Sequence, residues 1–362
     1  MTRRALPLLL VLLTACGGSS PVPAAGPAAP PVAAPGTSAP GTSAAPADGP
    51  QVLAVGLEAP WGIDFLPGGD ALVTERDRAQ VLRIPAAGGA PTLVREIEEA
   101  EPAGEGGLLG LAVSPTYATD GRVFLYVTTA RDNRIVSFSM TEPDAPLVPV
   151  LTGIPKGTIH NGGRLAIGPD GNLWAGTGDV GEKGLAQDSA SLGGKVLRMT
   201  LQGAPVAGAE SVVFSRGHRN VQGLAFDKTG QPYAVEFGQN RFDEVNRIRQ
   251  GSNGGWPEVE GAGDGGGRFL SPITTWEPSE ASPSGAAIVG DTLYVAALRG
   301  KRLWAVPLAD PGNPTAMYEG EYGRLRAAAA APDGSLWVLT SNRDGRGDPV
   351  DEDDRVLRLQ VA

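Results

Sequence analysis

One repeated phrase constrains the fold of this 362-residue chain more than any other feature. Each copy has a strand-like run of small and apolar residues, a turn of Pro, Asp or Gly, a second apolar run, and a short Val/Leu-Arg-Ile/Leu-type run. The turns come about 40 to 60 residues apart, which is the spacing of propeller blades. The first runs of the six copies are 61–65, 108–113, 164–167, 222–226, 285–289 and 325–331.

Short alternating runs at this spacing predict an all-β, six-bladed β-propeller, because no long window has helical periodicity. Another all-β fold, a sandwich or a solenoid, is the alternative. We expect the segment near Val52 to complete the last blade and close the ring. The loops of a propeller converge at one end of its channel, where ligands usually bind.

The N-terminus is typical of a targeting signal. Arg3 and Arg4 precede an apolar run, 5–15, which is shorter than the ~20 residues of a spanning helix, so we assign residues 1–15 to a signal peptide. The end of this run, Leu13-Thr14-Ala15-Cys16, resembles the lipobox of bacterial lipoproteins and implies a lipid on Cys16. Ordinary secretion with a chance cysteine is the alternative. Cys16 is the only cysteine, which excludes an intramolecular disulfide and a cysteine metal site.

Residues 16–50 predict a disordered tether, since nearly all are Ala, Pro, Gly, Ser or Thr. At roughly 3 Å per residue the tether could reach ~100 Å. It would join a cell-envelope lipid anchor, on the periplasmic or extracytoplasmic face, to one catalytic domain, 51–362. The net charge of −10 disfavours nucleic acid and anionic membrane surfaces as partners, so we expect membrane contact only through the lipid.

The chain has two histidines, and both lie in Gly-rich loops just before a repeat. His160 belongs to His-Asn-Gly-Gly-Arg before the third copy, and His218 to Gly-His-Arg-Asn before the fourth. A histidine in a loop is more often structural than catalytic, but two at equivalent blade entrances favour chemistry. Histidine is the natural general base near pH 7. Asp179, at the end of a neighbouring run, is the candidate to orient His160.

Arginines also gather where the runs begin. Arg219, Arg324 and Arg326 stand at such starts, and Arg299 lies in a Leu-Arg-Gly turn. Arg324 and Arg326 are two residues apart, so on a strand they would point the same way. Guanidinium groups bind carboxylates in bidentate fashion, so this ring suggests a planar anionic ligand. Taken singly, each arginine is better explained as a solvated surface residue.

An ordered set of motifs over 52–360 resembles the PQQ-dependent soluble glucose and aldose sugar dehydrogenases, the glucose/sorbosone dehydrogenase family. The motifs occupy 105–110, 160–164, 178–179, 217–220, 222–224, 236–240, 243–244, 253–257, 298–300 and 324–326. The resemblance implies oxidation of an aldose sugar at C1 to a lactone, by hydride transfer to PQQ. It also implies that electrons then pass to a quinone or another acceptor.

The resemblance also implies roles for individual residues. His160 would take the proton of the anomeric hydroxyl, Asp179 would hold His160, Arg219 would stabilise developing charge, and Glu105 would lie near the substrate. A Ca²⁺ ion would bridge PQQ to backbone carbonyls, in keeping with the preference of calcium for oxygen ligands. Those carbonyls would belong to Gly238 and Gln239. The cofactor would contact Asn220, Arg299, Arg324 and Arg326, with Trp276 stacked on it.

Some positions depart from the family pattern. Gln239 stands where proline is frequent, and Arg299 replaces the lysine of some members. The long insertions of the glucose-specific enzymes are absent, which favours a broad-specificity aldose dehydrogenase. Two alternatives remain. One is a calcium-dependent six-bladed lactonase or other hydrolase, which would need a cage of acidic and Asn side chains. The other is a non-catalytic ligand-binding propeller.

Overall fold

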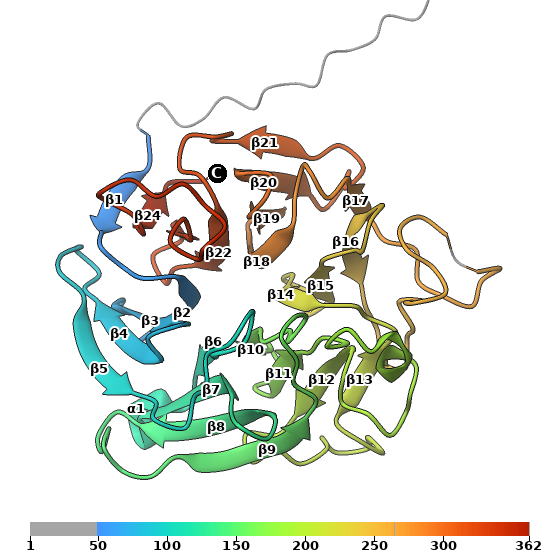
Figure 1. The fold of residues 1–362 in the computed structure, drawn as a ribbon, viewed down its shortest axis with the longest axis horizontal. Helices are drawn as coiled ribbons and strands as arrows, with labels where there is room; N and C mark the ends of the chain where they lie inside the picture. Colours follow the sequence, from blue (N-terminus) through green and yellow to red (C-terminus); the bar gives the residue numbers. More distant parts are fainter. Residues whose placement is uncertain (1–48, 264, 362) are drawn as a thin grey trace, which may run out of the picture. The chain divides into compact units, whose positions relative to one another are not determined.

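A computed structural model describes residues 49–263 and 265–361, and its strands form six four-stranded antiparallel sheets (Figure 1). The predicted six-bladed β-propeller is therefore confirmed. The signal peptide, Cys16 and nearly all of the tether lie outside the described residues, so their assignment stays a prediction. None of the helices in the described ranges is long and apolar enough to cross a membrane.

The first three blades contain twelve consecutive strands and two four-residue helical segments, α1 (Tyr117–Asp120) and the 3-10 turn η1 (Lys183–Ala186). The strands of blade 1 are β2 (Pro60–Phe65), β3 (Ala71–Glu75), β4 (Gln80–Ile84) and β5 (Thr92–Glu96). Those of blade 2 are β6 (Leu108–Val113), β7 (Arg122–Thr128), β8 (Asn133–Ser139) and β9 (Val148–Ile154). Those of blade 3 are β10 (Leu165–Ile167), β11 (Leu173–Gly176), β12 (Lys195–Met199) and β13 (Val213–Arg216).

The last three blades repeat this order, except that blade 6 takes its outer strand from the N-terminal side. The strands of blade 4 are β14 (Val221–Phe226), β15 (Pro232–Glu236), β16 (Asp243–Arg247) and β17 (Thr274–Trp276). Those of blade 5 are β18 (Pro283–Val289), β19 (Thr292–Ala297), β20 (Arg302–Pro307) and β21 (Thr315–Met317). Those of blade 6 are β22 (Leu325–Ala330), β23 (Leu336–Thr340), β24 (Val356–Leu359) and β1 (Gln51–Ala54).

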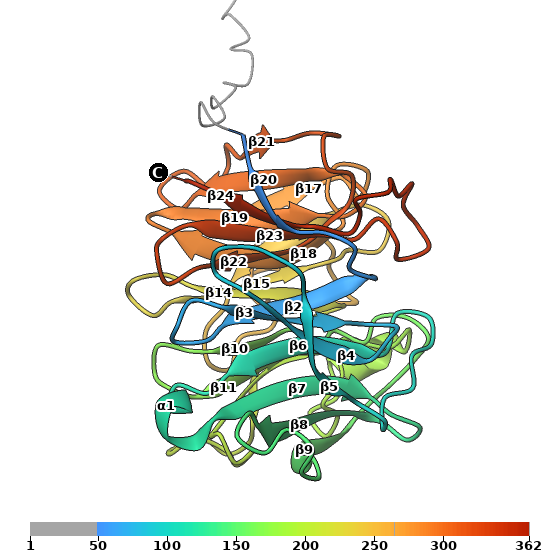
Figure 2. The ribbon, with the colours of Figure 1, turned by 90° about the vertical axis from the view of Figure 1, so that its left-hand side faces the viewer.

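The ring closes where β1 joins blade 6 (Figure 1). Val52 lies opposite Leu357 in the antiparallel pairing of β1 with β24, as expected for the segment near Val52. In the side view, blade 1 lies between blades 2 and 6 (Figure 2). Phe65 of blade 1 also packs edge-on against Trp337 of blade 6, with ring centroids 5.1 Å apart. The two ends of the repeat array are thus joined by hydrogen bonds and by aromatic packing.

The first strand of each blade lines the centre of the ring, and small residues let these strands approach one another. A Cβ added to Gly285 would lie 2.7 Å from Cα of Ala327, so neighbouring inner strands meet backbone to backbone. The clusters of buried apolar side chains lie between blades, for example Leu72 and Val81 of blade 1 with Leu108 and Leu125 of blade 2. Burying each such side chain contributes about 1.5–3 kcal/mol, so stability is spread over the six interfaces.

Candidate active site

A cavity of about 420 Å³ opens at the end of the channel where the inner strands begin. Loops from all six blades contribute to its wall, as expected for the ligand-binding end of a propeller. Its lining includes six arginines but only two carboxylates, those of Glu105 and Asp243. The arginines are Arg76, Arg219, Arg299, Arg324, Arg326 and Arg346. A positively charged cavity of this kind suits an anionic ligand.

His160 lies in the loop between β9 and β10 and is held from three sides. Its Nδ1 is 2.7 Å from Oδ1 of Asp179, and its Nε2 is 2.9 Å from Nη2 of Arg219. Its backbone N–H donates to Oε2 of Glu105 at 2.8 Å, while φ is +53°, a left-handed conformation that is uncommon outside glycine. The side chain is 14% exposed, so the ring faces the cavity without being freely solvated. The predicted pairing of His160 with Asp179 is thus present.

The environment of Asp179 fixes the tautomer of His160. Burial alone would raise the pKa of Asp179, but hydrogen bonds from His160, from the N–H of Gly181 and from the indole of Trp256 hold it below its usual range. An ionised Asp179 can only accept hydrogen bonds, so Nδ1 of His160 carries the proton. Nε2 therefore keeps its lone pair, accepts from Arg219, and is the nitrogen able to receive a proton.

Arg219 faces the same nitrogen from the loop before β14. Its Nη1 donates to the carbonyl of Phe237 at 3.2 Å, and its Nε is buried without a partner. Burial lowers the pKa of Arg219, and the carboxylates of Asp179 and Glu260 oppose that shift. A desolvated guanidinium with an unpaired donor is ready to stabilise negative charge on a ligand.

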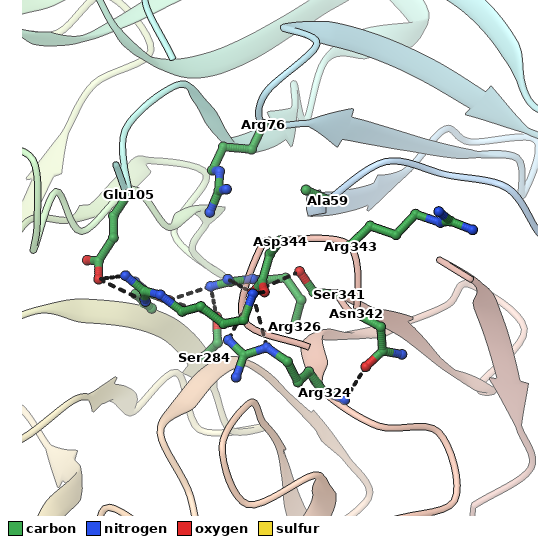
Figure 3. Close-up of polar contacts among 12 residues, drawn as sticks. Ala59, Arg76, Glu105, Ser284, Arg324, Arg326, Ser341, Asn342, Arg343 and Asp344 are labelled. Carbon is green, nitrogen blue, oxygen red and sulfur yellow. Dashed lines mark hydrogen bonds and ion pairs between the residues drawn. The ribbon is translucent and has the colours of Figure 1, made fainter. Parts of the chain in front are cut away.

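Arg324 and Arg326 converge on one buried carboxylate (Figure 3). Oδ2 of Asp344 lies 2.8 Å from Nη2 of Arg324 and 3.4 Å from Nη2 of Arg326, and Gln222 accepts from Nη1 of Arg326 at 2.9 Å. The expectation that Arg324 and Arg326 point the same way is confirmed. Burial lowers the pKa of Arg326 to about 10, although Asp344 opposes the shift. Nε of Arg326 is buried without a partner.

The segment after β15 contributes consecutive residues to the wall of the cavity. Gly238 and Gln239 belong to the lining, and Asp243 accepts the N–H of Gly238 at 2.9 Å. In the described residues, no group of three or more His, Cys, Asp or Glu side chains could hold a metal ion. Main-chain carbonyls are therefore the most suitable ligands for a cation here.

Most of the other predicted residues also reach the cavity. Asn220, Glu105 and Arg299 are part of the lining. Oδ1 of Asn220 accepts the N–H of Gly162 at 3.0 Å, which ties it to the His160 loop. Glu105 bridges His160 and Arg346, whose Nη1 and Nη2 each lie 3.2 Å from its Oε1.

Trp276 does not reach the cavity, which corrects the prediction that it stacks on the cofactor. It lies in β17, the outermost strand of blade 4, with 4% of its surface exposed. Its ring stacks on Trp304 of blade 5 with centroids 5.5 Å apart. An outer strand places its side chains between blades, whereas the cavity is built from inner strand starts and loops. Cys16 lies outside the described residues.

Several lining residues received no role from the sequence. Gln222 and Asp243 lie inside the motifs that carried the resemblance, so their motifs were the available signal. Trp61, Arg76 and Phe237 lie at or beside strand ends, where position in the repeat could have indicated them. Arg346 lines the cavity from the loop between β23 and β24, and the same loop supplies Asp344, the partner of Arg324 and Arg326. This loop has no counterpart in the repeated phrase and gave no signal.

Comparisons with known proteins agree with this architecture. A family model described as Glucose / Sorbosone dehydrogenase matches residues 57–351. A PQQ-bound aldose sugar dehydrogenase from Streptomyces coelicolor is 50% identical, with a TM-score of 0.82 over 88% of this chain and 99% of that chain.

Two curated relatives match at lower identity. Aldose sugar dehydrogenase YliI of Escherichia coli is 26% identical over 82% of this chain and 90% of its own length. Quinoprotein glucose dehydrogenase B of Acinetobacter calcoaceticus is 30% identical over 60% of this chain and 54% of its own length. Since the family model covers most of the propeller, this chain belongs to the glucose/sorbosone dehydrogenase family.

Proposed function

We propose that this chain is a PQQ-dependent aldose dehydrogenase that oxidises the anomeric hydroxyl of a sugar to a lactone. The observation that carries the proposal is the placement of His160, whose Nδ1 is held by Asp179 and whose Nε2 faces Arg219 in the wall of the cavity. Family membership and the PQQ-bound relative from Streptomyces coelicolor support the choice of cofactor.

The cavity fits PQQ, a planar quinone that carries three carboxylates. Two buried arginine nitrogens, Nε of Arg219 and Nε of Arg326, have no partner within the protein, and an anionic ligand would satisfy such donors. Arg299 is exposed at the mouth of the cavity. The residues that would hold the cofactor are Asn220, Arg299, Arg324 and Arg326. Bound PQQ would supply the hydride acceptor that the protein itself lacks.

The protein's own residues would perform the proton transfer. Nε2 of His160 accepts the proton of the sugar C1 hydroxyl, and the ionised Asp179 stabilises the imidazolium that forms. Arg219 would donate hydrogen bonds to the quinone oxygens of the cofactor, where negative charge would develop. Glu105, fixed by the N–H of His160 and by Arg346, lies beside this centre and is our candidate for contacts with the sugar hydroxyls.

We propose further that a Ca²⁺ ion binds to the main-chain carbonyls of Gly238 and Gln239. Both residues line the cavity, and the donor set is of the oxygen type that calcium prefers. A divalent cation beside the quinone would also increase its tendency to accept hydride. The electrons would then pass to a quinone or another acceptor.

Export and anchoring complete the proposal. Residues 1–15 would direct export, and Cys16 would carry a lipid that holds the protein at the extracytoplasmic face of the cell envelope. Support comes from the apolar run and from the Leu13-Thr14-Ala15-Cys16 motif. Labelling of growing cells with radioactive palmitate tests it. We expect label on the intact chain and none on Cys16→Ser, and an unlabelled intact chain would exclude the anchor.

A calcium-dependent hydrolase is less compatible with the cavity. Such an enzyme needs a cage of carboxylate and Asn side chains around its metal, whereas the described part of the chain holds no cluster of three acidic or histidine groups suited to a metal. A purely binding propeller would not require the Asp179–His160–Arg219 arrangement.

The deciding experiment adds PQQ and Ca²⁺ to purified apo-protein and follows reduction of a redox dye with several aldoses. We expect dye reduction that requires both PQQ and sugar, together with an absorption band of the bound quinone. Absence of both would overturn the dehydrogenase assignment. Hydrolysis of a lactone without PQQ would instead favour the hydrolase.

A further inference from the structure

The carboxylate of Glu260 gathers four consecutive backbone N–H groups onto one oxygen. Oε1 accepts from Gln239 at 2.6 Å, Asn240 at 2.8 Å, Arg241 at 2.9 Å and Phe242 at 3.3 Å. Successive amides that converge in this way form an anion-binding concavity. Here the anion belongs to the protein itself and comes from a residue about twenty positions further along the chain.

Because the peptide bond is planar, the contacts of these N–H groups also fix the directions of the carbonyl groups. In a trans peptide, the C=O of one residue points opposite to the N–H of the next residue. The peptides joining Gly238 to Gln239 and Gln239 to Asn240 are trans, since the cis bonds of the described chain lie elsewhere. The N–H groups of Gln239 and Asn240 point at Glu260, so the carbonyls of Gly238 and Gln239 point away from it.

The preceding peptide follows the same rule. Asp243 accepts the N–H of Gly238, and the carbonyl of Phe237 is taken by Nη1 of Arg219. Five consecutive amides, 238–242, are therefore bound by two side-chain carboxylates. The N–H groups of this loop bind carboxylates on one side of it. The carbonyl groups of Gly238 and Gln239 are therefore directed to the opposite side of the loop. Both residues line the cavity.

We infer that Glu260 is a positioning residue that aims the carbonyls of Gly238 and Gln239 into the cavity and so builds a main-chain cation site. The inference rests on the calcium site of the proposed function and assigns the geometry of that site to a residue that touches neither substrate nor cofactor. Without the carboxylate, four amides lose their shared acceptor and the two peptide planes are free to rotate.

Glu260→Ala tests the inference, because it removes the oxygen that accepts the four N–H groups, and Glu258→Ala is the matched control. Glu258 lies two residues away and makes an exposed ion pair with Arg268, so its variant removes the same charge without removing an acceptor of the 239–242 amides. Two measurements apply: hydrogen exchange of amides 239–242 in the absence of calcium, and calorimetric titration of the PQQ-loaded protein with Ca²⁺. We expect faster exchange and at least tenfold weaker Ca²⁺ binding in Glu260→Ala, and neither change in Glu258→Ala.

Equal Ca²⁺ affinity in Glu260→Ala and the unmodified protein would overturn the inference, as would equal weakening in Glu260→Ala and Glu258→Ala. If Glu260→Ala does not fold, Glu260→Asp keeps the charge but withdraws the carboxylate, and unchanged Ca²⁺ binding in that variant would also overturn it. An unmodified protein that reduces dye with PQQ but binds no Ca²⁺ would remove the cation site, and this inference with it, while leaving the dehydrogenase assignment standing.

Discussion

The two histidine loops occupy equivalent places at the entrances of blades 3 and 4, yet their side chains have different surroundings. His160 has its Nε2 at the cavity, opposite the guanidinium of Arg219. His218 is fully buried, with Nδ1 2.8 Å from Glu236 and Nε2 2.7 Å from Oγ of Ser215. Both nitrogens of His218 contact buried protein groups and His218 does not line the cavity, so it cannot exchange a proton with a ligand there.

The two histidines therefore suit different roles, since one borders the cavity and the other lies buried in a hydrogen-bond network. Glu236, the partner of His218, also accepts the backbone N–H of Arg219 at 2.8 Å. His218 therefore supports the loop that presents Arg219 to His160, although it does not line the cavity. Under the proposed function, His160 would take part in the reaction and His218 would stabilise the neighbouring loop, and each role can be tested separately.

Replacing His160 should give the largest effect on activity. His160→Ala removes the imidazole that we propose as the base, and general base catalysis typically contributes about 10²–10⁴-fold. We expect kcat to fall by this factor while PQQ binding, followed by its absorption band, is retained. The free energy of unfolding should fall by less than in His218→Ala, because His160 borders the cavity, where water can replace the donor that Asp179 loses. Unchanged kcat would remove His160 from the base role.

Replacing Asp179 should give the next largest effect, through the tautomer of His160. In Asp179→Asn the amide nitrogen must face either the indole N–H of Trp256 or the donors His160 and Gly181. Turned toward His160, the amide would force the proton onto Nε2, and we expect kcat to fall about 10²-fold.

A second substitution can separate this tautomer effect from loss of charge. Trp256→Phe removes the indole donor, so the amide nitrogen introduced by Asp179→Asn can turn to the position that the indole left. We therefore expect the double variant Asp179→Asn/Trp256→Phe to have a higher kcat than Asp179→Asn alone. Single-turnover kinetics would measure this directly. Equal rates in the two variants would show that the charge of Asp179, and not the tautomer, is what matters.

Replacing His218 should lower the stability of the protein more than its kcat, the opposite of replacing His160. His218→Ala leaves a buried carboxylate and a buried hydroxyl each short of one partner, which costs about 2–4 kcal/mol. Urea unfolding of the apo-protein measures this loss, with His160→Ala as the control. A small loss of stability with a large loss of kcat in His218→Ala would contradict the division of roles between the loops.

The sequence predicted the propeller because its repeated runs are the three inner strands of each blade, which carry the apolar residues. It missed outer strands such as β5 and β9, whose residues are mostly exposed or half-buried and so lack an alternating apolar pattern. The same reason explains Trp276: an aromatic residue on an outer strand packs between blades, and no local pattern reveals which face it takes.

The site was predicted unevenly for a related reason. His160, Asp179 and the arginine positions lie in short motifs, so they could be named individually from the resemblance. Asp344, Glu260 and Trp256 act through contacts with residues 18 to 77 positions away in the sequence. Such contacts depend on where the blades bring the loops together, and charge or motif alone does not specify them.

The smallest expected effect concerns the ion pair of Glu105 and Arg346, which joins the His160 loop to blade 6. Arg346, whose side chain is 60% exposed, pairs with Glu105, and Glu105 holds the N–H of His160. An exposed ion pair of this kind contributes about 0.2–1 kcal/mol, so Arg346→Ala should change KM for aldoses by no more than about fivefold and leave kcat nearly unaltered. Arg78→Ala, which removes an exposed arginine outside the cavity, should leave both constants unchanged. A large fall in kcat would instead mean that Glu105 needs Arg346 to hold the His160 loop. The Glu105–Arg346 ion pair would then contribute to catalysis.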